Sequence, residues 1–411
     1  MLGNKSCIMQ RFAFVFYLAI LLLLLFSVAC AKRVGQANLR SEMQDVYQAV
    51  LRLYSYVWSP EEFSKEENRD SILGLLERLD EDFHRAERVT PVEMFEPGFR
   101  ISLEIQQEML LDIRKRFAAG AKDYAAWQLR ALTTNCTACH SRYEVSLDFF
   151  GKVPLSKGDT FSEKLAYGEF LLASRQFDSA SENLLALAKE VSLTTAIEED
   201  MLTALKLWIL VQVRVKNRPD EAAKELKSFL VSTRVEERSK EVINSWVKTL
   251  MDLSKHEHFG REHPKTDELA RAAELLRSVQ IDDPSLIRDE LNLVSTLKAS
   301  SILHKYLQGD IPPKARRRST YLLALAYSHI PIFSFDAMGR LYLEQTIREF
   351  PESPEARLAY GLYEDCVINM NTGSGGLHLD EEEKKKLELL RRKAFGAAEL
   401  VMPDTLPDAT D

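Results

Sequence analysis

The chain is organised around the pentapeptide Cys136-Thr137-Ala138-Cys139-His140. In a helix, the two sulfurs lie three residues apart and the histidine follows four residues after the first, so all three side chains leave one face. Cys-x-x-Cys-His is the attachment signature of a c-type haem, because each thiol can add to a vinyl group while the imidazole binds the iron. The motif therefore predicts one covalent haem c, held by Cys136 and Cys139, with His140 as the axial iron ligand.

The same five residues allow three other interpretations. A redox dithiol is expected beside a βαβ pattern, whereas the residues around this motif have a helical pattern. A zinc site needs further Cys or His residues at motif spacing, and the sequence has no second pair of cysteines. The third interpretation is a chance match of two core cysteines and a histidine. The specificity of the pentapeptide in an exported chain favours haem.

Residues 1–31 have the pattern of a signal segment. A basic start with Lys5 and Arg11 precedes an apolar run over residues 12–29, which is just long enough for an uncleaved membrane anchor. The letters that follow fit either cleavage at a small-x-small site or lipidation of Cys30 at a sequence that resembles a bacterial lipobox. An unpaired cysteine at this place favours the lipoprotein. We expect an exported chain, either periplasmic or membrane-anchored and facing the periplasm.

Length, charge and cysteine usage restrict the class of protein. Two domains are expected, because 411 residues are too many for one core. The formal net charge of −8 and the lack of a Lys/Arg-rich tract argue against nucleic acid as a partner. The five cysteines suggest no disulfide framework, and Cys366 is expected to be a small buried side chain.

Four helices are predicted in the part of the chain that ends with the motif. Apolar residues at alternating steps of four and three mark a first helix over residues 39–57, and Pro60 stops it. A second helix begins near Ser71, a third extends over residues 99–117, and Gly120 separates the third from the helix that carries the motif. Four helices with short links favour an up-and-down bundle.

A four-helix bundle with a haem motif near the end of its last helix resembles the class II cytochromes c, which are the cytochrome c-prime group and its Met-ligated relatives. The resemblance rests on the pentapeptide, on Tyr143 three places beyond its histidine and on residues 94–98 before the third helix. It covers residues 37–150 and implies a haem domain in which Tyr143 adjoins the haem and two copies pair as a homodimer. Glu144 stands where the family often has a basic residue.

The opposite axial position of the iron decides what such a haem can do. A thioether there gives a saturated iron that transfers electrons, whereas an open position binds small gases or peroxide. The Met-ligated relatives carry their sixth ligand on the first helix, where Met43 lies on the inward apolar stripe, so we expect Met43 to be this ligand. A plain core role for Met43 is the competing interpretation, and Met94 and Met109 are weaker candidates.

The character of the sequence changes after residue 150. Residues 151–160 are predicted to be a linker, because they contain turn-forming residues. Residues 161–400 resemble a tetratricopeptide-like series of helix pairs, in which Ala180 and Ala222 occupy small-residue positions of two successive units. Such a solenoid (a stack of helix pairs) has a concave wall that usually binds proteins. Residues 401–411 are expected to form a frayed tail.

The sequence therefore predicts an all-α protein, in which a four-helix-bundle c-type cytochrome domain precedes an α-helical TPR-like solenoid. The expected role is electron transfer between redox partner proteins, with a further protein docked on the solenoid, and an electron carrier is favoured over an enzyme. Two alternatives stay open. One is a five-coordinate haem that senses a gas or acts as a weak peroxidase. The other is a helical scaffold lipoprotein without haem.

Overall fold

A computed structural model describes residues 39–57, 59–89, 97–142, 159–192, 198–262, 267–277 and 290–396. These residues are almost entirely helical, and one two-residue antiparallel pair, β1 (Thr372–Gly373) with β2 (Gly376–Leu377), is the exception among them. The prediction of an all-α protein is confirmed. No helix in the described ranges combines the length and the apolar composition that crossing a membrane requires. The predicted signal segment and tail lie outside these ranges.

The chain divides into two compact units, with the boundary between Phe95 and Glu96. The first unit contains the helix over residues 39–57, α2 (Pro60–Ser64), the 3-10 turn η1 (Glu66–Asn68) and α3 (Arg69–Val89). Pro60 occupies the first turn of α2, where a missing N–H costs no hydrogen bond.

The helix over residues 39–57 and α3 are joined by an ion pair. Arg85 donates from Nε to Glu42 at 2.8 Å, and its Nη2 also contacts the fully buried Asp82. Burial of Asp82 raises the pKa of its carboxyl group, and the nearby Arg85 opposes that rise. The predicted ligand Met43 lies on the same helix as Glu42, with a partly exposed side chain.

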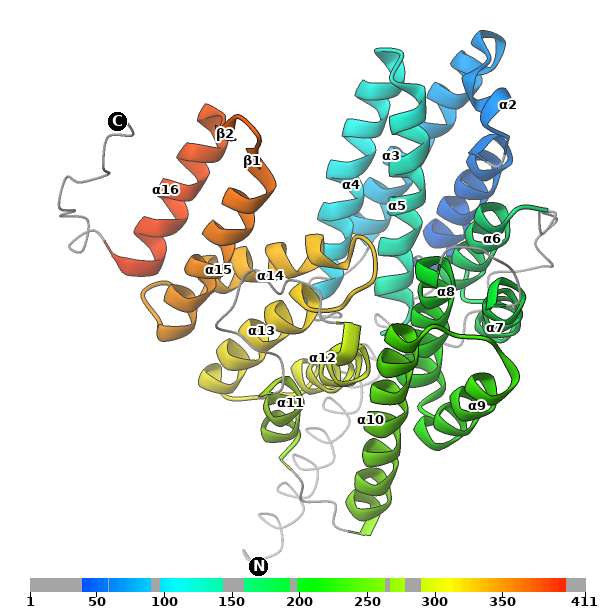
Figure 1. Cartoon of the computed structure of the whole chain (residues 1–411). Helices are drawn as coiled ribbons and strands as arrows, with labels where there is room; N and C mark the ends of the chain where they lie inside the picture. Colours follow the sequence, from blue (N-terminus) through cyan, green and yellow to red (C-terminus); the bar gives the residue numbers. More distant parts are fainter. Residues whose placement is uncertain are drawn as a thin grey trace, which may run out of the picture. The chain divides into compact units, whose positions relative to one another are not determined.

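The second unit begins with a helical hairpin, α4 (Pro97–Ala118) and α5 (Lys122–His140), and continues with a long series of helices (Figure 1). The series consists of α6 (Phe161–Ala173), α7 (Phe177–Ser192), α8 (Glu198–Leu210), the π-helical segment η2 (Val211–Lys216), α9 (Pro219–Ser232), α10 (Glu237–Glu262), α11 (Glu268–Arg277), η4 (Glu290–Asn292), α12 (Leu293–Leu307), α13 (Pro313–Ser328), α14 (Phe335–Glu349), α15 (Pro354–Asn371) and α16 (Glu381–Phe395).

Most helices that follow one another in this series pack against each other, as α6 does with α7 and as α12 to α16 do in turn. Sequential packing of this kind is what stacked helix pairs require, because each pair buries its apolar face on its neighbour. The α4–α5 hairpin belongs to the same unit, since α5 packs on α6 and α14 packs on α4. That residues 37–150 form one haem domain and that residues 161–400 are true TPR-like repeats remain predictions.

Two local signals define where the motif helix begins and where the next helix starts. Gly120 has a φ of +89°, in the left-handed region that favours glycine, and it turns the chain from α4 into α5 as the sequence predicts. Thr160 and Glu163 form a capping box at the start of α6, in which the Thr160 Oγ1 accepts from the Glu163 N–H at 3.3 Å. The motif helix and the helix that follows it therefore both begin at ordinary turn and capping signals.

Close approach of α13 and α14 depends on Gly339. A Cβ atom added there would lie 2.5 Å from the Ser328 Oγ and 2.7 Å from the Ser328 backbone nitrogen. Gly361, in the interior of α15, is the opposite case, because an added Cβ would meet no heavy atom of the described residues within 4 Å.

We therefore expect Gly339→Ala to lower the free energy of unfolding by about 1–3 kcal/mol, because backbone atoms have to move. Gly361→Ala should raise it by about 0.5–1 kcal/mol, because alanine loses less conformational entropy in a helix. Urea unfolding of the two variants checks both signs. A destabilised Gly361→Ala, or an unchanged Gly339→Ala, would contradict the packing described.

Candidate functional site

The predicted haem motif forms the last turn of α5, which ends at His140. The side chains of Cys136, Cys139 and His140 are all partly buried, and both thiols are free within the described residues. The helical spacing places the three side chains on one face. The structure thus brings together the three residues for which the sequence predicts covalent attachment and ligation.

The Cys136 thiol lies against α4. Gln106 of α4 donates from Nε2 to the Leu132 carbonyl oxygen at 3.2 Å, and the same nitrogen is 3.4 Å from the Cys136 Sγ. Burial raises the pKa of Cys136 to about 12, so this thiol is protonated at neutral pH. Reactive dithiols need a lowered thiol pKa, and this environment therefore disfavours the redox-dithiol interpretation.

The imidazole of His140 is oriented by a backbone carbonyl. Its Nδ1 lies 2.5 Å from the Ala173 oxygen at the end of α6. A carbonyl can only accept, so Nδ1 carries the proton and Nε2 keeps the lone pair that a metal ligand needs. Metal-bound histidines commonly donate their other N–H to a carbonyl in this way.

The charge state of His140 also suits a ligand. Burial, together with the positive charges of Arg175 and Arg142, lowers the pKa of His140 to about 3, although the hydrogen bond to Ala173 opposes this shift. The imidazole is therefore neutral at physiological pH, which is the state that binds a metal. The two thiols and this imidazole fit the donor set of a covalent haem.

The zinc interpretation gains nothing from the structure. Among the residues that the structure describes, no group of three or more His, Cys, Asp or Glu side chains is arranged to hold a metal ion. A structural zinc site needs four such ligands in closed coordination.

Of the other predicted site residues, only Met109 can be placed relative to the motif in the described structure. Tyr143 and Cys30 lie outside the described residues. Met43 belongs to the first compact unit, and its role as sixth ligand stays a prediction. Met109 of α4 lies near the motif helix, and its Sδ is 2.9 Å from the Nδ2 of Asn135, which immediately precedes Cys136.

Arg142, two residues after the motif, contacts side chains of α4 and of the distant helices α12 and α14. It donates from Nη1 to the Tyr342 hydroxyl at 3.2 Å, and its Nη2 contacts the Ser102 hydroxyl. The His304 Nε2 lies 3.5 Å from the same Nη1 and 2.8 Å from the Tyr327 hydroxyl. The end of α5 is therefore held by residues from four helices.

A second guanidinium reaches this network from the π-helical segment η2. Arg214 donates to the Ser141 hydroxyl at 3.4 Å and to the Ser300 hydroxyl at 2.5 Å, and its guanidinium carbon lies 5.2 Å from the centre of the Tyr327 ring. We call Arg142, Arg214, His304, Tyr327 and Tyr342 the basic aromatic cluster. Sequence reasoning missed this cluster, because its members are up to 200 residues apart and share no local pattern.

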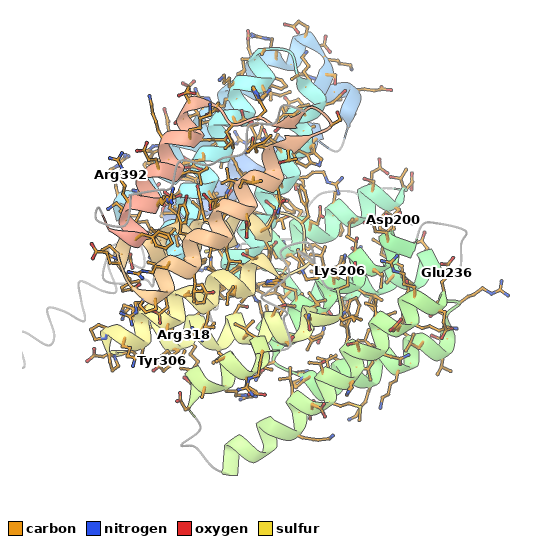
Figure 2. The ribbon with its side chains drawn as sticks, turned by 60° about the vertical axis from the view of Figure 1, so that its left-hand side comes forward. Asp200, Lys206, Glu236, Tyr306, Arg318 and Arg392 are labelled. Atoms are coloured by element: carbon orange, nitrogen blue, oxygen red, sulfur yellow. The ribbon has the colours of Figure 1, made fainter. Side chains whose placement is uncertain are left out.

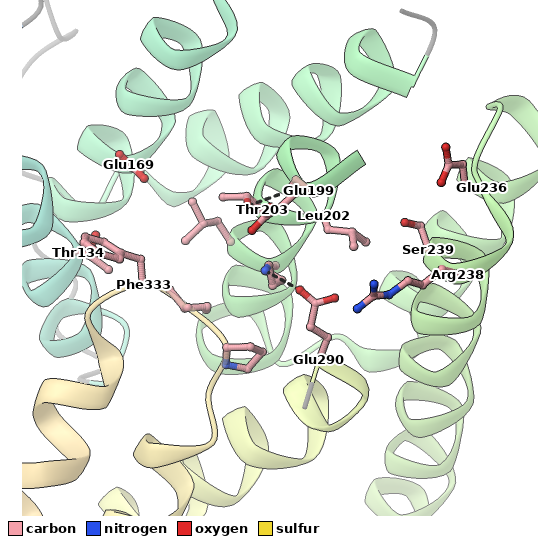
Figure 3. A pocket seen from close by; sticks show the side chains of 14 residues that line it. Thr134, Glu169, Glu199, Leu202, Thr203, Glu236, Arg238, Ser239, Glu290 and Phe333 are labelled. Atoms are coloured by element: carbon pink, nitrogen blue, oxygen red, sulfur yellow. Dashed lines mark hydrogen bonds and ion pairs between the residues drawn. The ribbon is translucent and has the colours of Figure 1, made fainter. Parts of the chain in front are cut away.

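A cavity of about 650 Å³ adjoins a different face of α5 (Figure 3). Thr134 lines it and precedes Cys136 by two residues, or about 200° around the helix. Four of its lining side chains are acidic and two are basic, namely Glu169, Glu199, Glu236 and Glu290 against Lys206 and Arg238. The cavity contains none of the motif residues, so it is separate from the predicted haem site.

Ion pairs cover parts of the cavity wall. Lys206 donates to the Glu290 Oε1 at 3.0 Å. Glu236, which is labelled with Lys206 in Figure 2, also lines the cavity. Glu169 lies 3.4 Å from the Arg130 Nη2, and burial raises the pKa of its carboxyl group. Phe333, which is 43% exposed, contacts the half-exposed Trp127 at a ring distance of 5.3 Å. The cavity thus has an acidic wall and an aromatic edge.

Comparison of the chain with protein-family models, with curated proteins and with solved structures yields no match. The interpretation of the site therefore depends on the pentapeptide and on the geometry around it.

The neutral His140 makes stability depend on pH in the haem-free variant Cys136→Ser/Cys139→Ser. The folded pKa is about 3 and an unfolded histidine titrates near 6.5, so below about pH 6.5 the unfolded chain binds a proton that the folded chain does not. The free energy of unfolding should fall by up to about 1.4 kcal/mol per pH unit between about pH 6.5 and pH 3.

Urea unfolding at pH 7 and pH 5 measures this loss. Adding His140→Gln should reduce the loss, whereas His84→Gln, which changes an exposed histidine of α3, should leave it as it was. An equal pH dependence with and without His140 would show that this imidazole is not held neutral by the fold.

Proposed function

We propose that the protein is an exported mono-haem c-type cytochrome that transfers electrons. Cys136 and Cys139 attach the haem, and His140 binds its iron. The observation that carries this proposal is the 2.5 Å hydrogen bond from His140 to Ala173, because it selects the tautomer in which Nε2 has the lone pair that iron needs, next to two free thiols on the same turn. A bound haem supplies a one-electron redox centre.

The residues of the chain have distinct tasks in this role. The Cys136 and Cys139 thiols would hold the haem through thioether bonds, and Gln106 positions the Cys136 thiol. The Ala173 carbonyl holds the His140 ring and increases its basicity as a ligand. The Asn135 side chain donates a hydrogen bond to the Met109 thioether. Met43 therefore stays the favoured candidate for the sixth ligand.

Export is part of the proposal. The signal pattern of residues 1–31 and lipidation at Cys30 would place the haem domain in the periplasm, free or anchored to the membrane. We propose that the haem domain belongs to the class II cytochromes c, which its sequence resembles. We also propose that two copies of this domain form a homodimer.

Partner recognition is assigned to the helices that follow α5. The acidic wall of the cavity and the exposed rings of Trp127 and Phe333 favour a protein partner that carries basic and apolar side chains. Only Thr134 and Trp127 of this surface belong to α5, so a docked redox protein would contact the motif helix on a face other than the one that carries the motif.

Haem attachment is tested with cysteine variants produced in a host that attaches haem to exported cytochromes. Cys136→Ser/Cys139→Ser should abolish covalent haem, because serine forms no thioether, and either single variant should reduce it. Cys366→Ser, which changes a partly buried thiol of α15, is the control and should retain full haem content. Haem staining after denaturing electrophoresis measures the result, and an unstained wild-type chain would refute the proposal.

Ligation is tested by the absorption spectrum of the reduced protein with and without carbon monoxide. A Met-capped iron should show no spectral change, and Met43→Ala should create a site that binds carbon monoxide. Met109→Ala is the matched control and should not open the iron. Carbon monoxide binding by the wild-type protein would instead favour the five-coordinate sensor or peroxidase, which is the second candidate function.

A further inference from the structure

Arg214 is a buried cation that has no acidic partner in the part of the chain that the structure describes. Arg214 is only 8% exposed. Its guanidinium is surrounded by the hydroxyls of Ser141 and Ser300 and by the rings of Tyr327 and Phe335. No carboxylate of the described residues pairs with it, and its Nε has no hydrogen-bond partner among them. Burying an unpaired charge is unfavourable, so this arrangement needs an explanation.

A second positive charge makes the arrangement less favourable still. The Arg142 guanidinium carbon lies 6.0 Å from the same Tyr327 ring to which Arg214 is 5.2 Å away. Burial is the main cause that lowers the pKa of Arg214, and the charge of Arg142 adds to it. The groups that contact Arg214 among the described residues are hydroxyls, phenols and aromatic rings, and none of them carries a negative charge that would neutralise its guanidinium.

The backbone around Arg214 is also unusual. It lies in the π-helical segment η2, which ends at Asn217 with a φ of 49°. Short π-helical segments inside helices are uncommon and occur frequently at functional sites. Through Ser141, this segment delivers its guanidinium to the residue next to His140.

We infer that Arg214 is the counter-charge for a carboxylate group of the attached haem, so that the helical repeat region contributes directly to the haem site. This inference rests on the proposed function. Haem carries two propionate carboxylates, and guanidinium groups bind carboxylates through paired charge-assisted hydrogen bonds. A free carboxylate or phosphate ion has the same chemistry, and the experiment separates the two sources.

The test compares Arg214→Gln in the haem-loaded chain and in the haem-free Cys136→Ser/Cys139→Ser chain. With haem, the substitution should lower the Tm by roughly 5–10 °C, because a buried carboxylate loses its partner, and it should lower the reduction potential. Without haem, the same substitution should leave the Tm unchanged or raise it, because it removes an unpaired buried charge.

Two further variants make the comparison specific. Arg214→Lys keeps the charge but not the planar fork, so it should restore part of the lost Tm and of the potential. Arg218→Gln changes a neighbouring exposed arginine that pairs with Glu221 at 3.2 Å, and it should alter neither quantity.

An equal loss of Tm from Arg214→Gln in both chains would overturn the inference, because the arginine would then be purely structural. A second pair of results would also overturn it. If acetate or phosphate raises the Tm of the haem-free chain only when Arg214 is present, and Arg214→Gln leaves the Tm of the haem-loaded chain unchanged, then Arg214 binds a free anion and not a haem carboxylate. The proposed function fails separately, if the wild-type chain itself carries no haem by its absorption spectrum.

Discussion

The site depends on one hydrogen bond, from the Nδ1–H of His140 to the carbonyl oxygen of Ala173. It connects the last residue of α5 with the last residue of α6, so the motif helix cannot turn about its axis without breaking it. The same bond fixes the tautomer, and burial with nearby arginines keeps the ring neutral. Ligand chemistry at His140 is therefore built into the packing of two helices.

The same end of α5 is held by residues from far along the chain. Arg142 reaches Tyr342 on α14, and Arg214 of η2 reaches Ser141. These contacts join the end of α5 to distant helices of the second unit, and they concentrate positive charge beside the motif. If the motif holds the proposed haem, a partner that shifts these helices would move the nearby guanidinium groups and so change the reduction potential.

Local patterns predicted a large part of this structure. The end of the first helix before Pro60, the turn at Gly120 and the motif on the last turn of α5 follow from turn chemistry and helical periodicity. The sequence predicts a linker at residues 151–160, whereas the boundary between the two compact units lies between Phe95 and Glu96. Neither that boundary nor the burial of Arg214 can be predicted locally, because both depend on which distant helices pack together.

Covalent attachment is tested most directly by mass spectrometry of peptides from the mature protein, isolated from a bacterium that attaches haem to exported cytochromes. The account predicts one haem adduct on the peptide that contains Cys136 and Cys139. If both thiols are free and no peptide carries a porphyrin, the account is contradicted, and the buried arginines and the oriented His140 would need another explanation.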